Sequence, residues 1–223
     1  LVVIGTGPGG YVAAIRAAQL GMSVAVVEKR PSHGGTCLNV GCIPSKALLH
    51  ASEMFHEAGH VFARLGVKVG GPELDLKAMM AHKDATIRGN VQGIDFLFKK
   101  NKIEHVAGSA TLQRDASGLR LQVDGRELRA PHIILATGAR PREMPFMPID
   151  GEHVISSKQA LVLPKLPETM IVVGSGAIGS EFAYFYAALG VKVTIVEYLP
   201  QIMPLEDEEV AKTMERSFRK LKA

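Results

Sequence analysis

The chain has 223 residues, of which 47% are hydrophobic, and its formal net charge at pH 7 is +4. This length suggests one large or two modest domains. No apolar run is long enough to span a membrane, and the basic residues are spread along the chain, so neither a membrane nor a nucleic acid is expected as a partner. With only two cysteines, the chain is not a disulfide-stapled secreted domain.

Both ends of the sequence look cut. The chain begins inside an apolar strand, Leu1-Val-Val-Ile-Gly, and a helix predicted over residues 208–223 ends without a Gly or Asn cap. We therefore expect an N-terminal piece of a longer protein, with any targeting peptide lying upstream of it.

The first thirty residues predict a dinucleotide-binding unit. An apolar strand over residues 1–4 precedes the motif Gly5-Thr-Gly7-Pro-Gly-Gly10 and a helix over residues 11–20. In such motifs the first glycine forms the turn, the second lets backbone approach a pyrophosphate, and the third lets the helix pack on the strand. A second strand over residues 23–27 ends at Glu28, which is placed to accept hydrogen bonds from a ribose.

The segment Gly-Gly-Thr-Cys-Leu-Asn-Val-Gly-Cys-Ile-Pro-Ser-Lys follows and holds both cysteines, Cys37 and Cys42. On an ideal helix, residues five apart lie roughly 8.6 Å apart between Cα atoms, beyond the limit of about 7 Å for a disulfide. If the pair oxidises, the backbone must leave the helix, and Asn39 and Gly41 tolerate such a departure. By themselves, two thiols fit redox chemistry and two small buried hydrophobic side chains equally well.

Pro44 suits the first turn of a helix that continues through Lys46. The positive end of this helix and the lysine would favour a thiolate at Cys42. Two thiols are too few for a closed zinc site without histidines. None of the nearby histidines pairs with the cysteines at a recognised metal spacing, so we expect no metal site; these are His50, His56, His60 and His82.

The middle of the chain changes from helical to strand patterns. Helices are predicted from Pro44 to about Gly59 and over residues 74–100. Strands are predicted over residues 102–106, 119–123 and 127–130, with a two-residue hairpin turn at Asp124-Gly125. This β-meander leads into a buried strand over residues 132–136.

A second dinucleotide-binding unit is predicted at the end of the chain. Proline-rich linkers over residues 140–148 and 163–167 flank a short helix, predicted over residues 156–163. Then come a strand over residues 169–173, the motif Gly174-Ser-Gly176-Ala-Ile-Gly179, a helix over residues 180–189 and a strand over residues 191–196. Glu197 follows and favours NAD(H), because it would repel a 2′-phosphate. Two nucleotide sites and one dithiol suit electron transfer between the dithiol and bound nucleotides.

Residues 34–46 resemble the redox-active segment of the pyridine nucleotide-disulfide oxidoreductases, FAD enzymes that include glutathione reductase, mercuric reductase and dihydrolipoamide dehydrogenase. Leu38, Ile43 and Ser45 are most similar to the last of these. The segment Thr137-Gly138-Ala139-Arg140-Pro141 resembles the one that closes the family's FAD domain.

The resemblance implies an α/β fold with two Rossmann-like dinucleotide-binding domains and a β-meander insert. Residues 1–147 would form the FAD-binding domain with the redox disulfide, incomplete because its return segment is missing. Residues 148–223 would form a linker and the N-terminal part of an NAD-binding domain. The C-terminal dimerisation domain, which supplies the family's catalytic base, would be absent, so we expect the 223-residue piece alone to be inactive.

The resemblance also implies the roles of site residues. Cys37 would exchange with the substrate, Cys42 would be the flavin-side thiol and Lys46 would lie near flavin N5. The residues implied for FAD are Gly5, Gly7, Pro8, Gly9, Gly10, Glu28, Lys29, Gly35, Thr36, Cys37, Lys46, Gly108, Thr137, Gly138 and Ala139. The residues implied for NAD are Gly174, Ser175, Gly176, Ala177, Ile178, Gly179, Glu181 and Glu197.

The function implied is the oxidation of dihydrolipoamide to lipoamide with NAD⁺, as the E3 component of 2-oxo acid dehydrogenase complexes. Expected partners are lipoyl domains of an E2 acyltransferase or the glycine cleavage H protein, and a second copy of the full-length chain, in a bacterial cytoplasm or a mitochondrial matrix. Three alternatives stay open: a mercuric or glutathione-type reductase, against which Glu197 argues; a flavin-dependent NADH oxidase or ferredoxin reductase, which lacks this cysteine segment; and a nucleotide-binding fragment without catalysis.

Overall fold

The computed structural model describes residues 1–115 and 118–221, which form two compact units. Unit 1 contains Leu1–Ile43 and Ala85–Glu143, and unit 2 contains Pro44–Asp84 and the chain from Met144 onward. The domain limits expected from the sequence stay a prediction. Within the described part of the chain, none of the helices combines the length and apolarity that a membrane span needs.

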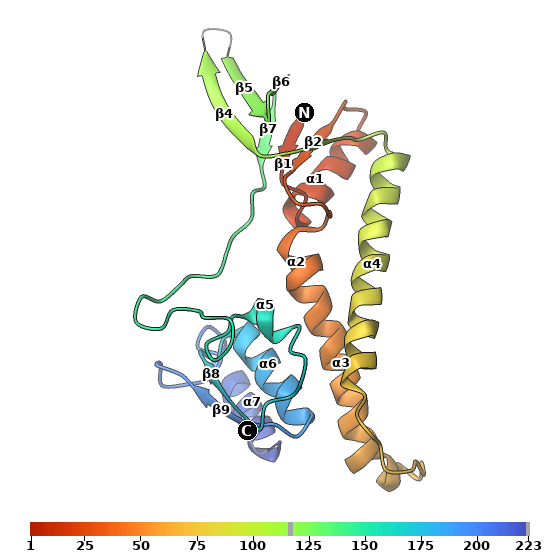
Figure 1. Cartoon of the computed structure of the whole chain (residues 1–223), viewed down its shortest axis with the longest axis vertical. Coiled ribbons are helices and arrows are strands. Elements are labelled where there is room, and N and C mark those ends of the chain that lie inside the picture. The colour runs from red at the N-terminus through yellow and green to blue at the C-terminus, as the bar shows by residue number, and fades with distance from the viewer. Residues whose placement is uncertain (116–117, 222–223) are drawn as a thin grey trace. The chain divides into compact units, whose positions relative to one another are not determined.

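Unit 1 is built on a four-stranded parallel sheet with the order β3-β2-β1-β7. The strands are β1 (Val2–Ile4), β2 (Ala25–Glu28), β3 (Glu104–Ala107) and β7 (Ile133–Leu135). Val3 lies between its partners Val26 and Ile134, so β1 is an inner strand. The helix α1 (Pro8–Gln19) follows β1 and packs on β1 and β2, which is the strand-helix-strand unit predicted from the glycine motif (Figure 1).

Small and apolar side chains hold α1 and the second part of α4 (Leu76–Lys100) on this sheet. Ala14 is fully buried and lets α1 approach the strands closely, while Ile94 and Phe98 of α4 are buried in the same cluster. The buried members of this core are Val3, Ala14, Ala17, Val24, Val26, Leu38, Ile94, Phe98 and Ile103. The apolar period of α4 therefore marks a core-facing side, as predicted.

The β-meander differs from its prediction. It consists of β4 (Ala110–Asp115), β5 (Gly118–Val123) and β6 (Arg126–Arg129), all antiparallel, whereas the strand predicted over residues 102–106 is β3 of the parallel sheet. β4 was not predicted because most of its side chains are polar and exposed. The hairpin turn is confirmed: Asp124 and Gly125 both have positive φ, 45° and 90°, as a type I′ turn requires.

β7 was predicted to be a buried strand, and this was wrong for the described chain. Ile134 is 36% exposed and Leu135 is 65% exposed. β7 is the edge strand of the parallel sheet, so one side of it has no neighbouring strand among the described residues.

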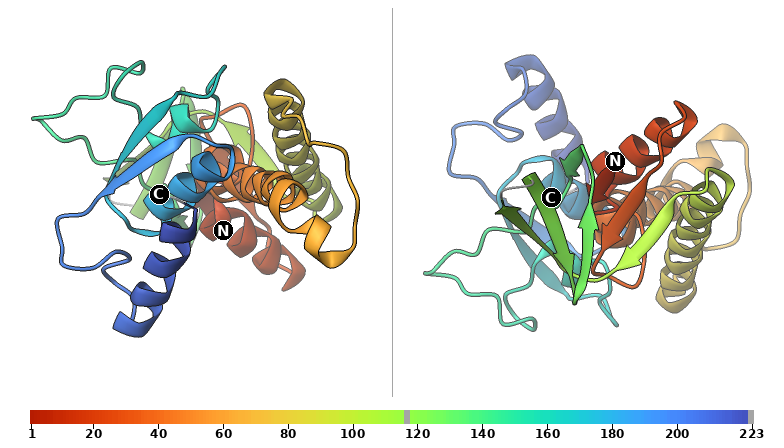
Figure 2. Two further views of the ribbon diagram at one scale, coloured as in Figure 1. Left: turned by 90° about the horizontal axis from the view of Figure 1, so that it is seen from below. Right: turned by 90° about the horizontal axis from the view of Figure 1, so that it is seen from above.

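Unit 2 repeats the strand-helix-strand order on a smaller scale. Its parallel sheet pairs β8 (Thr169–Val173) with β9 (Lys192–Val196), and α6 (Ala177–Ala188) packs on both strands (Figure 2). The remaining helices are α5 (Ser157–Ala160), α7 (Glu208–Lys220), η1 (Phe62–Leu65), most of α3 (Cys42–His60) and the first part of α4. α6 begins three residues earlier than predicted because Gly176 caps it, and α5 is shorter than predicted. Residues 222–223, part of the predicted last helix, lie outside the described residues.

Candidate functional site

The first glycine motif forms a turn that only glycine permits. Gly5 has a φ of 97°, and its N–H donates to the carbonyl of Val27 at 2.8 Å. A Cβ on Gly10 would lie 1.9 Å from the Gly5 carbonyl oxygen, so α1 could not pack so closely on β1 with any other residue. Gly7 caps α1 without a side chain, which leaves the helix N-terminus open towards an anion.

Glu28 is the last residue of β2, the second strand of this strand-helix-strand motif, and it is 7% exposed. Its Oε2 accepts two hydrogen bonds from Thr6, at 3.0 Å from the backbone N–H and at 2.7 Å from the hydroxyl. Its Oε1 accepts from the Arg30 N–H at 3.0 Å. Burial alone would raise the pKa of Glu28, but the hydrogen bonds from Arg30 and Thr6 hold that pKa below its usual value. The carboxylate is therefore charged, and one of its roughly four acceptor positions is left beyond the three bonds from Thr6 and Arg30.

Unit 2 contains the same hydrogen-bond pattern at the second motif. Gly174 has a φ of 94° and donates to the Val196 carbonyl at 2.8 Å, and a Cβ on Gly179 would lie 2.0 Å from the Gly174 oxygen. Glu197 accepts from the Ser175 N–H at 2.8 Å and from the Ser175 hydroxyl at 2.7 Å.

A third bond to Glu197 comes from the Leu199 N–H at 3.0 Å. This bond and those from Ser175 lower the pKa of Glu197 to about 2. The two units thus place a charged carboxylate at the end of the second strand through three equivalent donors. The sequence shows the internal repeat only as a motif, and in the structure the two copies also share the same hydrogen bonds to the carboxylate.

The two motifs differ in what surrounds them. A Cβ on Gly35 would lie 2.5 Å from Cα of Gly7, so the start of the cysteine segment closes on the first motif. At Gly174 and Gly176 no described atom lies within 4 Å of the position that a Cβ would take. Among the described residues, the first motif therefore has another segment packed against it, and the second has none within this distance of Gly174 and Gly176.

The cysteine segment is two helices separated by one residue. α2 (Gly35–Val40) carries half-buried Cys37, and α3 begins at the exposed Cys42. Gly41 between them has φ −145° and ψ −115°, which interrupts the helix, and a Cβ there would lie 2.9 Å from the Thr36 oxygen. The interruption predicted from the thiol spacing therefore lies at Gly41.

Asn39, the other residue considered for this interruption, is helical. Its amide nitrogen donates to the carbonyls of His33 at 2.8 Å and Gly35 at 2.9 Å, and its oxygen accepts from the Ser32 hydroxyl at 2.8 Å. The Asn39 side chain therefore links the loop before α2 to α2 itself, the helix that carries Cys37.

In unit 2, Lys46 and Ser45 of α3 both contact Glu181 of α6. Lys46 Nζ pairs with Oε1, and the Ser45 hydroxyl donates to Oε2 at 3.0 Å. Lys46 and Glu181 were each expected near a cofactor, but their pairing was not predicted. The carboxylate of Glu181 is held at both oxygens and lies next to a fixed positive charge.

The other residues predicted for FAD lie mostly at the carboxyl ends of the parallel strands of unit 1. Gly108 follows β3, with a φ of 138° and its N–H donating to the Glu28 carbonyl at 2.9 Å. The exposed residues Thr137, Gly138 and Ala139 follow β7. Ligands of open α/β sheets bind at this edge. The remaining predicted positions are in the first turn of a helix or exposed beside one of the motifs: Pro8, Gly9, Lys29, Thr36, Ala177 and Ile178.

Sequence reasoning missed two contributors to the first site. Thr6 was not singled out, although the hydroxyl at the same place in the second motif, Ser175, marks it. His33 Nδ1 lies 3.3 Å from the Thr6 hydroxyl oxygen, and no local pattern indicates this contact. Asp124 was predicted only as a turn residue, yet its Oδ2 would lie 2.5 Å from a Cβ on Gly108.

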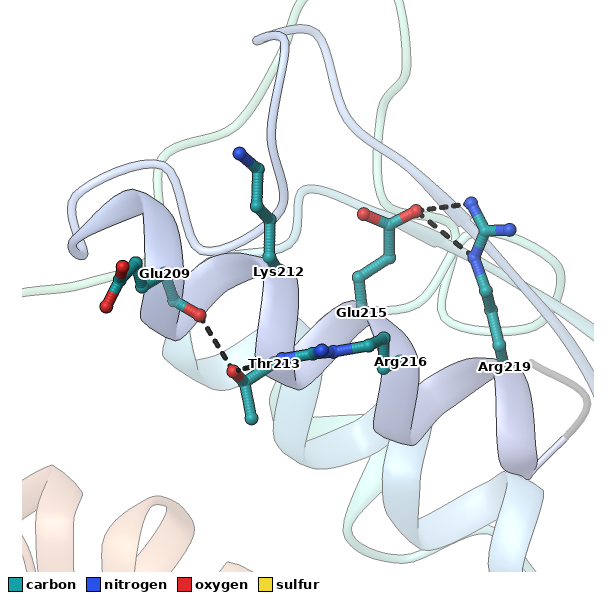
Figure 3. A pocket seen from close by; sticks show the side chains of 6 residues that line it. All are labelled: Glu209, Lys212, Thr213, Glu215, Arg216 and Arg219. Carbon is teal, nitrogen blue, oxygen red and sulfur yellow. Dashed lines mark hydrogen bonds and ion pairs between the residues drawn. The ribbon is translucent and has the colours of Figure 1, made fainter.

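A shallow hollow lies on the surface of α7, and none of the predicted site residues lines it (Figure 3). Charged side chains line most of it, and Arg219 pairs with Glu215 at 2.6 Å within the helix. Such i,i+4 pairs are ordinary features of an exposed helix. Among the described residues, no group of three or more His, Cys, Asp or Glu side chains is placed to hold a metal ion.

Paired strand-helix-strand units, each with a glycine turn and a terminal carboxylate, define a protein of the double dinucleotide-binding fold. A family model described as pyridine nucleotide-disulphide oxidoreductase matches residues 1–222. The chain belongs to this family.

Similar proteins include "Dihydrolipoyl dehydrogenase 2, mitochondrial" of Arabidopsis thaliana, which is 47% identical over 100% of this chain and 44% of its own length. Among solved structures, LpdA from Mycobacterium tuberculosis matches with a TM-score of 0.89 at 30% identity, over 99% of this chain and 49% of that one. The HOCl-induced flavoprotein disulfide reductase RclA from Escherichia coli matches with a TM-score of 0.81 at 28% identity, over 99% and 47%. The chain thus spans about half the length of these relatives.

Proposed function

We propose that this chain carries the nucleotide sites and the dithiol of a dihydrolipoyl dehydrogenase, which oxidises dihydrolipoamide to lipoamide and reduces NAD⁺. The observation that carries the proposal is that the same arrangement of a glycine turn and a carboxylate occurs twice, once before and once after the Cys37–Cys42 segment in the sequence. The relative named dihydrolipoyl dehydrogenase, 47% identical over the whole chain, supports the choice of substrate.

The first site fits a resident FAD. Its glycine turn is closed by the cysteine segment, because Gly7 and Gly35 meet with no room for a Cβ on the latter. The buried, charged Glu28 would hold the adenosine ribose, and the open N-terminus of α1 would face the pyrophosphate. FAD, when bound, would supply the two-electron relay between the dithiol and NAD⁺.

The second site fits an exchangeable NAD⁺. No described atom lies within 4 Å of the position that a Cβ would take on Gly174 or Gly176, and this lack of close neighbours suits a nucleotide that binds and leaves. Glu197 would accept hydrogen bonds from the ribose hydroxyls. Because its pKa is about 2, the carboxylate is charged at every physiological pH and would repel the additional phosphate of NADP⁺.

The dithiol would take two electrons from the substrate by thiol exchange. One thiolate of dihydrolipoamide attacks Sγ of Cys37 in the oxidised pair, which forms a mixed disulfide and releases the Cys42 thiolate. The second thiol of the substrate then attacks the mixed disulfide, which releases lipoamide and leaves both cysteines reduced. Dihydrolipoamide loses two electrons and two protons, NAD⁺ takes both electrons and one proton, and one proton is released.

The partners follow from the same proposal. Dihydrolipoamide would arrive on a lipoyl domain of an E2 acyltransferase or on the glycine cleavage H protein, and the full chain would form a homodimer. A mercuric or glutathione-type reductase is the alternative within the family, and the charged Glu197 disfavours it because it disfavours NADP(H).

Steady-state turnover of the full chain tests the proposal. The wild type should form NADH from dihydrolipoamide and NAD⁺, and Cys37→Ser and Cys42→Ser should each abolish this reaction. Both variants should still pass electrons from NADH to a small artificial acceptor, since the nucleotide sites are unchanged. Reduction of Hg²⁺ or oxidised glutathione, without lipoamide activity, would instead support the alternative.

A further inference from the structure

We propose that His33 is a positioning residue of the first nucleotide site, which holds the Thr6 hydroxyl so that its hydrogen points at Glu28. The inference rests on the proposed function, in which Glu28 binds the ribose of FAD. His33 is not part of the glycine motif, the carboxylate or the dithiol, so the proposed function gives it no role.

The Thr6 hydroxyl has a single hydrogen to donate. The Thr6 hydroxyl lies 2.7 Å from Oε2 of Glu28 and 3.3 Å from Nδ1 of His33. An ionised carboxylate can only accept, so the hydroxyl hydrogen must point at Glu28. The same oxygen can then only accept from His33, so a hydrogen bond between the two side chains requires a hydrogen on Nδ1. The proposal therefore specifies one tautomer of the neutral ring.

The surroundings of His33 hold the ring in this orientation. His33 is 8% exposed and packs edge-on against Phe98 at 4.9 Å and His105 at 4.4 Å between ring centroids. Nε2 lies 3.6 Å from Oδ1 of Asp95, and this acceptor favours a hydrogen on Nε2, so it competes with the Thr6 contact for the tautomer.

The charge of the ring follows from these neighbours. Burial and His105 lower the pKa of His33, and Asp95 and Glu28 oppose them only in part. The pKa of His33 therefore lies below its usual value, which favours the uncharged ring, and the proposal assigns the one hydrogen of that ring to Nδ1.

Unit 2 has a donor at the equivalent hydroxyl. The Ser175 hydroxyl donates to Glu197 at 2.7 Å, and the Met203 N–H lies 3.3 Å from the hydroxyl oxygen and 3.1 Å from the Ser175 carbonyl oxygen, to both of which it can donate. The two units therefore orient equivalent hydroxyls by the same pattern, a backbone N–H in one and the His33 side chain in the other. Only the donor in unit 1 can be removed by substitution without changing the backbone.

The test compares two amides at position 33 in the full chain. Asn places its amide nitrogen near the position of Nδ1, whereas Gln places its nitrogen near that of Nε2. FAD binding to the flavin-free protein would be followed by flavin fluorescence at neutral pH. We expect His33→Asn to bind FAD within about twofold of the wild type and His33→Gln about fivefold more weakly, the size of one hydrogen bond. In a Thr6→Val background the two variants should bind FAD equally, because His33 acts through the hydroxyl.

A ¹⁵N NMR spectrum of the histidine-labelled wild type tests the tautomer directly and depends on no variant. A protonated Nδ1 at neutral pH is expected, and a protonated Nε2 alone would overturn the inference. Equal FAD affinities of the Asn and Gln variants would overturn it as well, with the proposed function intact. A wild-type chain that binds NAD⁺ but no FAD would refute the proposed function at this site instead.

Discussion

Lys46 and Glu181 form an ion pair in unit 2, although 135 positions separate them in the sequence. The Ser45 hydroxyl binds the other carboxylate oxygen at 3.0 Å, so the position of Glu181 is fixed from two sides. The Lys46 side chain is 60% exposed. Water therefore screens most of the attraction, and the pair adds little to stability. The ion pair would instead serve the reaction, by holding a positive charge and a carboxylate in fixed positions.

Glu181→Gln should distinguish an effect of the ion pair on stability from an effect on the reaction. The amide keeps an acceptor for Ser45 but loses the charge, so the free energy of unfolding should change by less than about 1 kcal/mol. Turnover of dihydrolipoamide with NAD⁺ should fall at least about tenfold, as expected for the loss of a charge-assisted hydrogen bond. Glu215→Gln, which breaks a similar exposed pair with Arg219 on α7, is the matched control and should change neither quantity. Unchanged turnover in Glu181→Gln would remove the pair from the mechanism.

Glu197 should make the stability of the protein depend on pH in the acid range. Its pKa falls from 4.5 to about 2 in the folded chain, so folding favours the ionised form. The stabilisation is complete above the unfolded pKa and is lost as pH falls from about 4.5 to about 2. Urea unfolding at a series of pH values should show a shallower decline for Glu197→Gln than for the wild type. Parallel curves would mean that Glu197 is not held by Leu199 and Ser175 as described.

Two adjacent glycines of α1 should differ strongly in how much the same substitution destabilises the protein. A Cβ on Gly10 would lie 1.9 Å from the Gly5 oxygen, whereas no described atom lies within 4 Å of a Cβ on Gly9. Gly10→Ala should therefore lower the free energy of unfolding by about 2–3 kcal/mol and weaken FAD binding. Gly9→Ala should change stability by no more than about 1 kcal/mol. Chemical unfolding of both variants checks this, and similar values for the two would contradict the described packing of α1 on β1.

Tyr186 should contribute to stability through one buried hydrogen bond. The residue is fully buried, and its hydroxyl donates to the Ala160 carbonyl at 2.5 Å. Tyr186→Phe should lower the free energy of unfolding by about 1–2 kcal/mol, because the carbonyl is left without this donor. Tyr198→Phe provides the control, since Tyr198 is 98% exposed, and should have no measurable effect. An effect of equal size at both positions would argue against the buried bond.

The sequence predicted the parts of the fold that depend on local chemistry. The glycine turns at Gly5 and Gly174 both require positive φ, and the hairpin at Asp124 and Gly125 requires it twice, so residue type marks each of them. Gly41 was recognisable because two thiols five positions apart cannot be bridged along a regular helix.

Features that depend on contacts between distant segments were not predicted. β4 pairs with β5 through its backbone, so its mostly polar and exposed side chains carry little strand pattern. β7 has an apolar sequence typical of a buried strand, yet it lies at the edge of the described sheet. The contact between His33 and Thr6 and the pairing of Lys46 with Glu181 span 27 and 135 positions and follow no periodicity.

The central claim is that electrons enter through Cys37 and leave through NAD⁺, and an anaerobic titration of the full chain with dihydrolipoamide tests it most directly. The visible spectrum should show that the bound flavin is reduced, and added NAD⁺ should restore the oxidised spectrum while NADH appears. The flavin of Cys37→Ser should respond to NADH but not to dihydrolipoamide. A wild-type flavin that stays oxidised with dihydrolipoamide but is reduced by NADH would contradict the substrate assignment and leave the two nucleotide sites in place.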